Sequence, residues 1–497
     1  MEIKIALIHA RVSNNNVPPL GLLSIAGFLE EKKIEVRVWD PSLYDKDFIA
    51  EVREFNPDII GISLMTAQYG RAKEIIYLLR DKIPQAIYIC GGSHVSALPE
   101  ESLKGLNADV AVVGEGELTM YEFCCRYNED CDWQELRGIS YLSEGKVISN
   151  QRRELIDNLD TLPFTGRELL STSFNWYLIP PGAIRGMFAP RTTTMMTSRG
   201  CPYNCVFCAS QIIFGHHFRR RSVNNVIEEI CYLQKRYGVE GIWFLDDTFT
   251  FDRDWVRRFC SALIRQGLNP IWSCQTRVDT LDIELLRQMK LAGCVQVEIG
   301  VESGSDKVLK ALSKNICSDD FEEKFTQMKQ LGLRVMTNFM IGSPEEEVAD
   351  IRATYQLAKR LKPDFIKFNV CTPYPGSRLY QIAQRKGWLV EDQINFNSNW
   401  SEQFTRVPVM HINIDPLYLL KLRARLQNRF LWRNYGNIIK GFLHSSVHSF
   451  QVVKAIFFYL KENYRSFLGF LKEGKFDAII WEFYSYYSRM TRDSSHP

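Results

Sequence analysis

The chain has 497 residues, more than one hydrophobic core usually organises, and we expect two or three domains. Hydrophobic residues make up 45% of it and charged residues 24%, a balance typical of globular proteins that argues against extended disorder. The formal net charge of +3 is close to neutral and argues against nucleic acid as a partner.

The start of the chain alternates like a strand and lacks the features of a secretory signal, so we expect a cytoplasmic protein. No stretch approaches the roughly 18 apolar residues of a membrane span. Lys454, Lys461 and Arg465 interrupt the apolar segments near the carboxyl end. The chain has 13 cysteines, and in the cytoplasm these favour reduced thiols and a metal site over disulfides.

Residues 1–130 alternate strand and helix patterns. Strand patterns occupy Ile3 to His9 and Glu35 to Trp39, with a helix pattern at Leu22 to Glu30 between them. Three further strand patterns follow, at 59–63, 86–90 and 110–113. Since crossovers between parallel strands are right-handed, this alternation predicts a doubly wound parallel sheet of the Rossmann-like kind.

Residues 131–190 read as an irregular linker with a short hairpin pattern at 138–149. A second alternating series fills residues 191–395, with strand patterns at 241–245, 270–275, 296–300, 334–341 and 365–370. This series predicts a partial or full (β/α) barrel, whose active site lies at the carboxyl ends of the strands.

Residues 396–497 read as helices rich in aromatic side chains. From His411 onward there are thirteen Lys and Arg against six Asp and Glu. One interpretation is a helical cap over the barrel. The other is a basic, aromatic surface that lies on an anionic membrane.

Three cysteines share one short segment directly after the first strand of the second series. Cys201, Cys205 and Cys208 form a CxxxCxxC pattern. Three thiolates can hold three irons of a 4Fe-4S cluster and leave the fourth iron open to a ligand. The alternative is a structural zinc site, but such sites have four ligands, and no fourth Cys or His stands at a matching spacing.

This loop and its place resemble the radical S-adenosylmethionine superfamily. The resemblance implies that the open iron binds the methionine part of S-adenosylmethionine, whose reductive cleavage gives a 5′-deoxyadenosyl radical. It also implies that Tyr203 and Phe207 flank the adenine, although loop packing explains either residue nearly as well.

Polar residues at the ends of other barrel strands fit the same cofactor. Asp246 and Glu302 follow two strands, and Gln275 and Arg277 end a third. Carboxylates there can bind an ammonium group and ribose hydroxyls, as the corresponding strands do in similar family members. For Asp247, the helix-capping role is equally compatible with the sequence.

The amino-terminal series carries a second set of residues at strand ends, where open α/β sheets bind ligands. Together they resemble the cobalamin-binding domain found ahead of the barrel in one branch of the superfamily. The residues that the resemblance assigns to cobalamin are Gly21, Ser63, Thr66, Gly91, Gly92, His94, Gly114, Glu115 and Gly116.

The chain departs from that family in one respect. The signature Asp-x-His-x-x-Gly, which supplies a histidine to cobalt, is absent, and no histidine stands between Asp40 and Ala50. His94 is therefore either a contact to the corrin or its tail, or a histidine of a surface loop. An empty scaffold or another ligand remains the alternative for the whole domain.

The resemblance implies a methyltransferase that uses cobalamin and acts on an unactivated carbon of a bulky or apolar, small-molecule or lipid-like substrate. A reduced protein of the flavodoxin or ferredoxin type would supply electrons. One alternative is a cobalamin-dependent cyclase or oxidoreductase without methyl transfer. Another is a non-catalytic iron-sulfur or cobalamin-binding protein.

Overall fold

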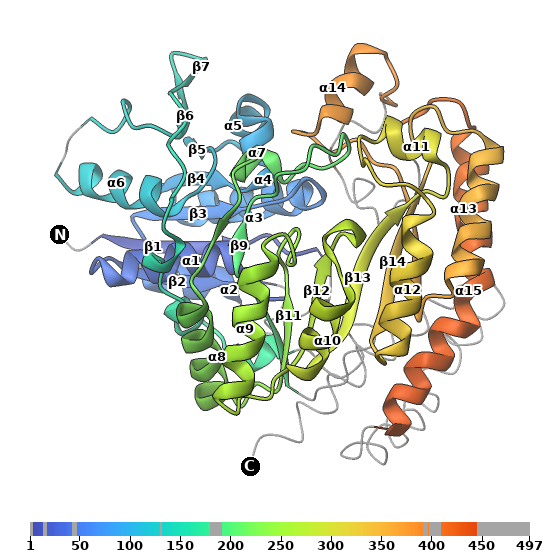
Figure 1. Ribbon diagram of the computed structural model, residues 1–497. Coiled ribbons are helices and arrows are strands. Elements are labelled where there is room, and N and C mark those ends of the chain that lie inside the picture. The colour runs from blue at the N-terminus through green and yellow to red at the C-terminus, as the bar shows by residue number, and fades with distance from the viewer. Residues whose placement is uncertain are drawn as a thin grey trace, which may run out of the picture.

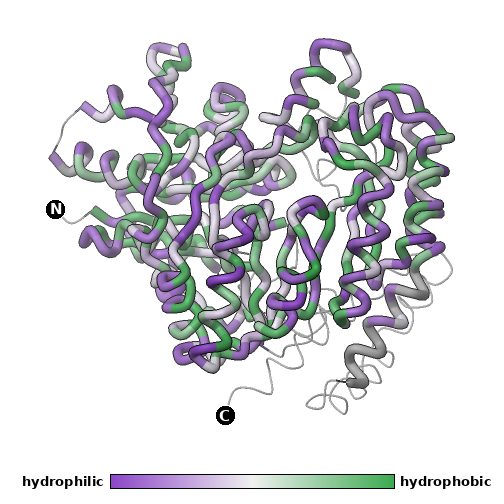
Figure 2. Tube along the Cα trace, viewed as in Figure 1, coloured by the Kyte–Doolittle hydropathy of each residue, from purple (hydrophilic) through white to green (hydrophobic). Residues whose placement is uncertain are grey.

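Two large sheets, each built mainly of parallel strands, stand side by side in the computed structural model (Figure 1). The structure describes residues 3–12, 17–41, 47–129, 132–178, 191–390, 396 and 409–444. Hydrophilic and hydrophobic stretches alternate along the helices that surround the sheets (Figure 2).

The first sheet has seven strands in the order β2-β1-β3-β4-β5-β6-β7. Its strands are β1 (Lys4–His9), β2 (Glu35–Trp39), β3 (Ile59–Ser63), β4 (Ile87–Gly91), β5 (Val110–Val112), β6 (Ile139–Ser143) and β7 (Lys146–Ser149). The first five are parallel, which confirms the predicted doubly wound sheet.

Helices cover both faces of this sheet because successive side chains of each strand point to opposite sides. Leu7 belongs to the apolar core that includes α1 (Leu20–Glu31) and α6 (Glu117–Asn128). Ile8 belongs to the core of the other face. The helices on that other face are α2 (Phe48–Phe55), α3 (Tyr69–Lys82) and α5 (Pro99–Leu106), and the short α4 (Ser93–Ala97) follows β4.

The hairpin β6–β7 extends this sheet. Strand β6 pairs antiparallel with β5, and Val113 N donates a hydrogen bond of 2.8 Å to Gly138 O. The predicted boundary at residue 130 therefore falls between strands of one sheet. The rest of the predicted linker contains, up to residue 178, three short 3-10 helices, at Leu159–Thr161, Thr165–Leu169 and Phe174–Tyr177.

The second sheet has six parallel strands in the order β15-β14-β13-β12-β11-β8. They are β8 (Thr192–Met195), β11 (Gly241–Phe244), β12 (Ile271–Thr276), β13 (Cys294–Glu302), β14 (Arg334–Ile341) and β15 (Phe365–Val370). Because β8 and β15 are edges of the described sheet, the barrel is partial.

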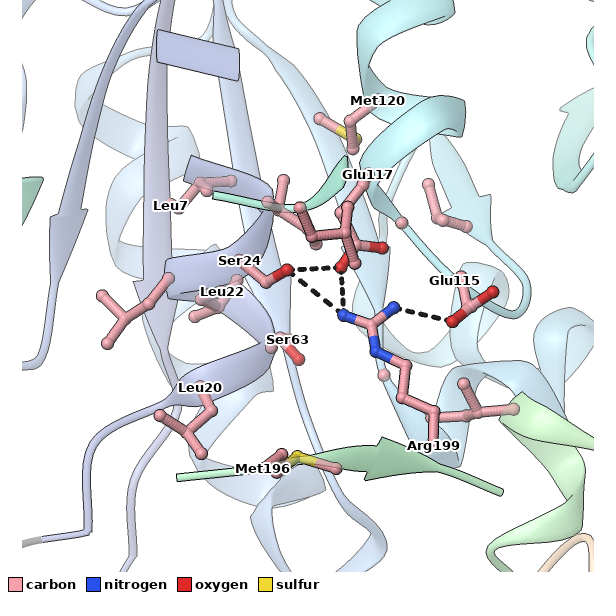
Figure 3. A pocket seen from close by; sticks show the side chains of 18 of the residues that line it. Leu7, Leu20, Leu22, Ser24, Ser63, Glu115, Glu117, Met120, Met196 and Arg199 are labelled. Carbon is pink, nitrogen blue, oxygen red and sulfur yellow. Dashed lines mark hydrogen bonds and ion pairs between the residues drawn. The ribbon is translucent and has the colours of Figure 1, made fainter. Parts of the chain in front are cut away.

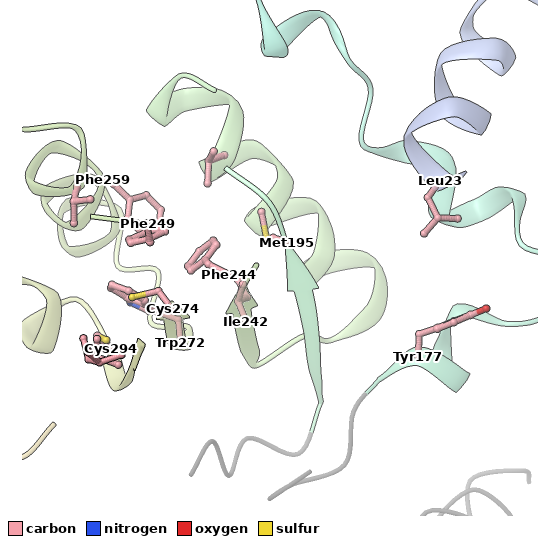
Figure 4. Close-up of a cluster of buried hydrophobic side chains, with 14 of the residues drawn as sticks. Leu23, Tyr177, Met195, Ile242, Phe244, Phe249, Phe259, Trp272, Cys274 and Cys294 are labelled. Atoms are coloured by element: carbon pink, nitrogen blue, oxygen red, sulfur yellow. The ribbon is translucent and has the colours of Figure 1, made fainter. Parts of the chain in front are cut away.

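Helices line the outer side of this barrel, as predicted. They are α8 (Val223–Tyr237), α9 (Arg253–Arg265), α10 (Ile283–Leu291), α12 (Asp320–Gln330) and α13 (Val348–Leu361). Two shorter helices, α11 (Asp306–Ala311) and α14 (Arg378–Arg385), lie toward the carboxyl ends of the strands (Figure 1). Alternate strand residues, including Ile242, Phe244 and Cys274, pack into the core beneath the outer helices (Figure 4). The intervening residues of these strands consequently face the barrel interior.

Helix α15 (Pro416–His444) covers the outer edge strand β15. The Gln427 side chain accepts a hydrogen bond from Phe368 N at 3.0 Å and donates one to Ile366 O at 3.1 Å. An edge strand with its backbone groups so occupied is closed to further pairing. The described part of the carboxyl-terminal region thus covers one edge of the barrel sheet, and the predicted basic, aromatic surface lies mostly outside the described residues. None of the described helices is long and apolar enough to cross a membrane.

Candidate active site

The three predicted cluster cysteines lie in one loop after β8 and the short β9 (Ser198–Arg199). Cys201, Cys205 and Cys208 are partly exposed free thiols. The backbone turns between the last two, where Cys208 N donates to Cys205 O over 3.2 Å.

An apolar anchor holds the middle of this loop. Val206 N donates to Leu312 O at 3.1 Å, and Val206 O accepts from Leu379 N at 2.7 Å. Val206 is buried in the same apolar cluster as both partners, and Phe207 packs against that cluster. The loop is thereby fastened to the ends of α11 and α14, and Phe207 takes part in its packing.

The loop fits an iron-sulfur cluster through its donor chemistry. Among the described residues, no three side chains of His, Cys, Asp or Glu lie close enough together to hold a single metal ion. Burial raises the pKa of Cys208 to about 11. Burial also raises the pKa of Cys205, while the charges of Lys314 and Arg277 oppose this shift. Three thiols in one loop beside two cations suit a cluster that needs thiolate ligands.

Arg277 connects the end of β12 to this loop. Its Nη1 donates to Cys205 Sγ at 3.8 Å, and its guanidinium carbon lies 3.8 Å from the centroid of the Tyr203 ring. Its Nη2 donates to Lys314 O at 2.8 Å and forms an ion pair with Asp279. The structure thus brings the predicted residues Tyr203 and Arg277 together at the cysteines.

Asp246 has a different surrounding from the one expected of a cofactor ligand. Its fully buried carboxylate accepts hydrogen bonds from Thr197 N at 3.1 Å, from Thr197 Oγ1 at 2.6 Å and from Ser198 Oγ. Arg220 lies 3.9 Å away. These contacts fix the segment that leads into the cysteine loop.

The neighbouring Asp247 interacts electrostatically with the cysteine loop instead. Its charge acts on Cys201 and Cys208, and its side chain hydrogen bonds with Ser210. Although Asp247 as a whole residue is exposed, loss of hydration around its carboxyl and the charge of Asp246 raise the pKa of that carboxyl to about 6. It does not cap a described helix, because α9 is capped by Asp252.

Glu302 and Gln275 lie at the ends of β13 and β12. Glu302 adopts φ 64° and pairs with Lys314 Nζ at 2.7 Å. Gln275 is the register partner of Glu298, whose Oε1 accepts from Asn338 Nδ2 at 2.5 Å. Because these positions alternate with core residues, the barrel interior presents polar side chains across β12, β13 and β14.

A cavity of about 250 Å³ opens at the carboxyl ends of the first sheet (Figure 3). Apolar side chains form most of its wall, and Figure 3 shows Leu7, Leu20, Leu22 and Met120 around it. Arg199 and Met196, from the beginning of the barrel, close the other side. The cavity therefore lies where the two sheets meet.

Six of the nine residues predicted for cobalamin line this cavity: Gly21, Ser63, Gly92, Gly114, Glu115 and Gly116. A Cβ atom at Gly21 or Gly114 would meet nothing within 4 Å, so a ligand can approach the backbone there. Gly92 has φ 99°, and a Cβ atom would lie 2.5 Å from Leu64 O. Glycine is thus required at this turn.

The other three, Thr66, Gly91 and His94, are not among the lining residues. His94 is fully buried, and its Nδ1 lies 3.2 Å from Thr66 Oγ1. Its ring packs against Tyr69 and Phe396, and burial lowers its pKa to about 4. His94 is therefore a neutral interior residue, and its interpretation as a surface-loop histidine is wrong.

Two charged residues of the cavity wall, Glu117 and Arg199, are not among the residues predicted for either cofactor, whereas Glu115 is. Arg199 pairs with Glu115 and Glu117 at 2.6 Å each. Outside the cavity lining, Asp40 is buried and pairs with Arg11 at 2.8 Å. The sequence alone does not indicate that arginines and acids so far apart along the chain form ion pairs.

Comparisons with known proteins agree with this arrangement. Residues 7–123 match the B12 binding domain and residues 195–358 match the Radical SAM superfamily. The chain is 32% identical over 446 residues to an uncharacterized methyltransferase of Pyrococcus horikoshii, covering 86% of this chain and 93% of that one. It is 28% identical to the cytidylyl-2-hydroxyethylphosphonate methyltransferase of Streptomyces wedmorensis, covering 78% and 82%.

A solved structure shares the fold. The radical S-adenosylmethionine methyltransferase TsrM of Kitasatospora setae, with cobalamin and a [4Fe-4S] cluster bound, superimposes with a TM-score of 0.68 and 17% identity. The match covers 78% of this chain and 79% of that chain. The two sheets and their order along the chain are thus those of a known architecture.

Proposed function

Because the chain belongs to the radical S-adenosylmethionine enzymes that carry a cobalamin-binding domain, we propose that it methylates an unactivated carbon of a small molecule. The observation that supports this most directly is the cavity of Figure 3, which meets the segment leading into the cysteine loop at Arg199. The family's cofactors are a 4Fe-4S cluster, S-adenosylmethionine and cobalamin. When bound, they supply radical chemistry and a methyl group, while the protein supplies position and a dry site.

The residues proposed to hold the cluster are the three cysteines of the loop. For S-adenosylmethionine we propose Tyr203, Gln275, Arg277 and Glu302, together with Asp247. Asp247 takes the role first expected of Asp246, because the Asp246 carboxylate is committed to Thr197 and Ser198. A carboxylate beside the cysteine loop suits the ammonium group of the methionine part.

The cobalamin residues of the proposal are the six that line the cavity. The apolar wall and the glycines that leave backbone exposed suit a large, flat ligand. His94 is buried behind Tyr69 and Phe396 and is left out of this set.

The substrate of the proposal carries hydrogen-bonding groups beside its apolar part. The Glu298 and Asn338 pair lies on the interior side of β13 and β14, with Gln275 next to it in register. Buried polar groups of this kind favour a substrate that can satisfy them. A reduced flavodoxin or ferredoxin is the proposed electron donor, and contact of the carboxyl-terminal region, residues 396–497, with a membrane stays a prediction.

The test begins with the full chain, purified without oxygen and reconstituted with iron, sulfide and hydroxocobalamin. We expect about four irons and about one cobalt per chain. With dithionite and S-adenosylmethionine alone, the protein should release 5′-deoxyadenosine. Zinc in place of iron, or no 5′-deoxyadenosine from a fully loaded protein, would contradict the proposal.

Two cysteine variants make the assignment specific. Cys205→Ala should lose the iron and the 5′-deoxyadenosine. Cys231→Ala, which changes an exposed thiol on α8, should retain both. With S-adenosylmethionine labelled in its methyl group, the product mass separates methyl transfer from cyclisation or oxidation.

A further inference from the structure

A buried ion-pair cluster joins the two sheets beside the cavity. We define it by Glu115, Glu117, Arg199 and Arg219. Glu115 Oε1 pairs with Arg199 at 2.6 Å and its Oε2 pairs with Arg219 at 2.8 Å. Glu117 Oε1 also pairs with Arg199 at 2.6 Å (Figure 3). The side chains are between 3% and 14% exposed, so the four charges are almost withdrawn from water.

The two arginines sit directly opposite each other on the small sheet of β9 and β10 (Arg219–Arg220). Like charges in this position repel. Glu115 bridges them, one carboxylate oxygen to each. The geometry of the sheet that leads into the cysteine loop therefore depends on a carboxylate from the first domain.

The two acids flank Gly116 in the cavity wall: Glu115 lies in the turn after β5, and Glu117 is the first residue of α6. The Glu117 carboxylate also accepts a hydrogen bond of 2.6 Å from Ser24 Oγ on α1. Burial on its own would raise the pKa of Glu117, but the charge and hydrogen bonds of Arg199 and the bond from Ser24 hold it below its usual range. Glu117 is consequently ionised at neutral pH.

Only Gly200 separates Arg199 from Cys201. Gly200 has φ 85°, and a Cβ atom there would lie 2.2 Å from His217 O. This backbone has little room to absorb a shift. A displacement of the Arg199 guanidinium is thus transmitted to the first cysteine.

We propose that Glu115, Glu117 and Arg199 are positioning residues that set the separation between the cobalamin cavity and the cysteine loop. The proposal rests on the proposed function, since it concerns the two cofactors assigned there. Arginine suits this role because its planar fork can reach both carboxylates at once, whereas a lysine offers a single point charge.

The test compares Glu117→Gln and Arg199→Lys with a matched control, Glu122→Gln. Glu122 lies on the same helix as Glu117, and its ion pair with Arg153 on the following segment involves neither β9 nor β10. Each full-length variant is reconstituted with the cluster and hydroxocobalamin, and its iron and cobalt contents are measured. The milder Ser24→Ala removes the hydrogen bond that Ser24 donates to Glu117 and the one that it accepts from Arg199, and it leaves the ion pairs in place. It serves if either main variant fails to fold.

The main readout is electron paramagnetic resonance of cob(II)alamin in the presence of the reduced cluster. The magnetic coupling between the two centres falls with the cube of their distance, so it reports the separation independently of activity. We expect full cofactor content and altered coupling in Glu117→Gln and Arg199→Lys, and wild-type coupling in Glu122→Gln. S-adenosylhomocysteine is S-adenosylmethionine that has given up its methyl group, and 5′-deoxyadenosine is the product of radical cleavage. In Glu117→Gln and Arg199→Lys, the ratio of the first product to the second should fall by about tenfold to 100-fold.

The outcomes separate the two levels of the proposal. If the wild type takes up no cluster or no cobalamin, the proposed function fails. If the wild type takes up both cofactors and the variants keep the wild-type magnetic coupling and product ratio, the positioning role is overturned. The ion-pair cluster then serves stability alone.

Discussion

Arg277 and Tyr203 stack at the cysteine loop, with the guanidinium carbon 3.8 Å from the ring centroid. The same guanidinium donates to Cys205 Sγ and to Lys314 O, so one side chain joins the aromatic ring, a thiol and the barrel backbone. A cation held over an aromatic ring contributes about 1–2 kcal/mol when partly shielded from water.

Replacing Arg277 should therefore impair the loop without unfolding the protein. We expect Arg277→Gln to lower the rate of 5′-deoxyadenosine release by about tenfold, which corresponds to about 1.4 kcal/mol. Arg257→Gln is the control, because Arg257 pairs with Asp282 near the surface of α9. Equal rates in both variants would show that the stack has no role in this reaction.

The second prediction concerns Gly200, where a side chain would clash with the neighbouring backbone. A Cβ atom in Gly200→Ala would clash with His217 O at 2.2 Å, in a backbone conformation that disfavours any side chain. We expect the variant to bind less iron, measured by metal analysis after reconstitution. Gly145→Ala, at φ 76° with nothing within 4 Å, carries the backbone strain without the clash and should bind iron normally. Normal iron content in Gly200→Ala would mean that the loop tolerates the shift.

The sequence predicted the parts of this molecule that depend on local pattern. The strands Arg334–Ile341 and Phe365–Val370 occur with the predicted bounds, because their apolar pattern and flanking turns define them. The CxxxCxxC loop was identifiable because its three ligands are neighbours in sequence.

Features that depend on tertiary contact were not predictable in this way. Asp246 and Asp247 look equivalent in sequence, yet only Asp246 is enclosed by Thr197 and Ser198. The link of Arg199 to Glu115 spans 84 positions and two domains. The antiparallel addition of β6 to β5 was hidden for the same reason, since pairing of a hairpin with a distant edge has no local signature.

Glu346 predicts a pH dependence of stability. Its buried carboxylate accepts hydrogen bonds from Gly342 N and Ser343 N, yet burial raises its pKa from 4.5 to about 7. The folded state thus binds the proton more tightly than the unfolded state. This stabilisation is complete below pH 4.5 and is lost as the pH rises through 7, a change of about 3 kcal/mol.

Glu346→Gln should remove this dependence, because the neutral amide can still accept from the two backbone groups. We expect the melting temperatures of variant and wild type to agree near pH 5, and the variant to melt higher near pH 8. Thermal unfolding followed by circular dichroism at both pH values is the measurement. A difference that stays constant between them would contradict the assigned pKa shift.

The two neighbouring aspartates should separate stability from cofactor binding. Asp246→Asn leaves one acceptor for donors at Thr197 N, Thr197 Oγ1 and Ser198 Oγ, and each buried donor without a partner costs about 1–3 kcal/mol. It should lower the melting temperature and the iron content together.

Asp247→Asn removes a charge that acts on Cys201, and we assign the Asp247 carboxylate no role in fixing the backbone. Its melting temperature should stay within a few degrees of wild type, while S-adenosylmethionine binding, measured by equilibrium dialysis on the reconstituted protein, should weaken by about tenfold. If Asp246→Asn proved to be the stable variant that binds the cofactor poorly, the roles given to the two residues would be reversed.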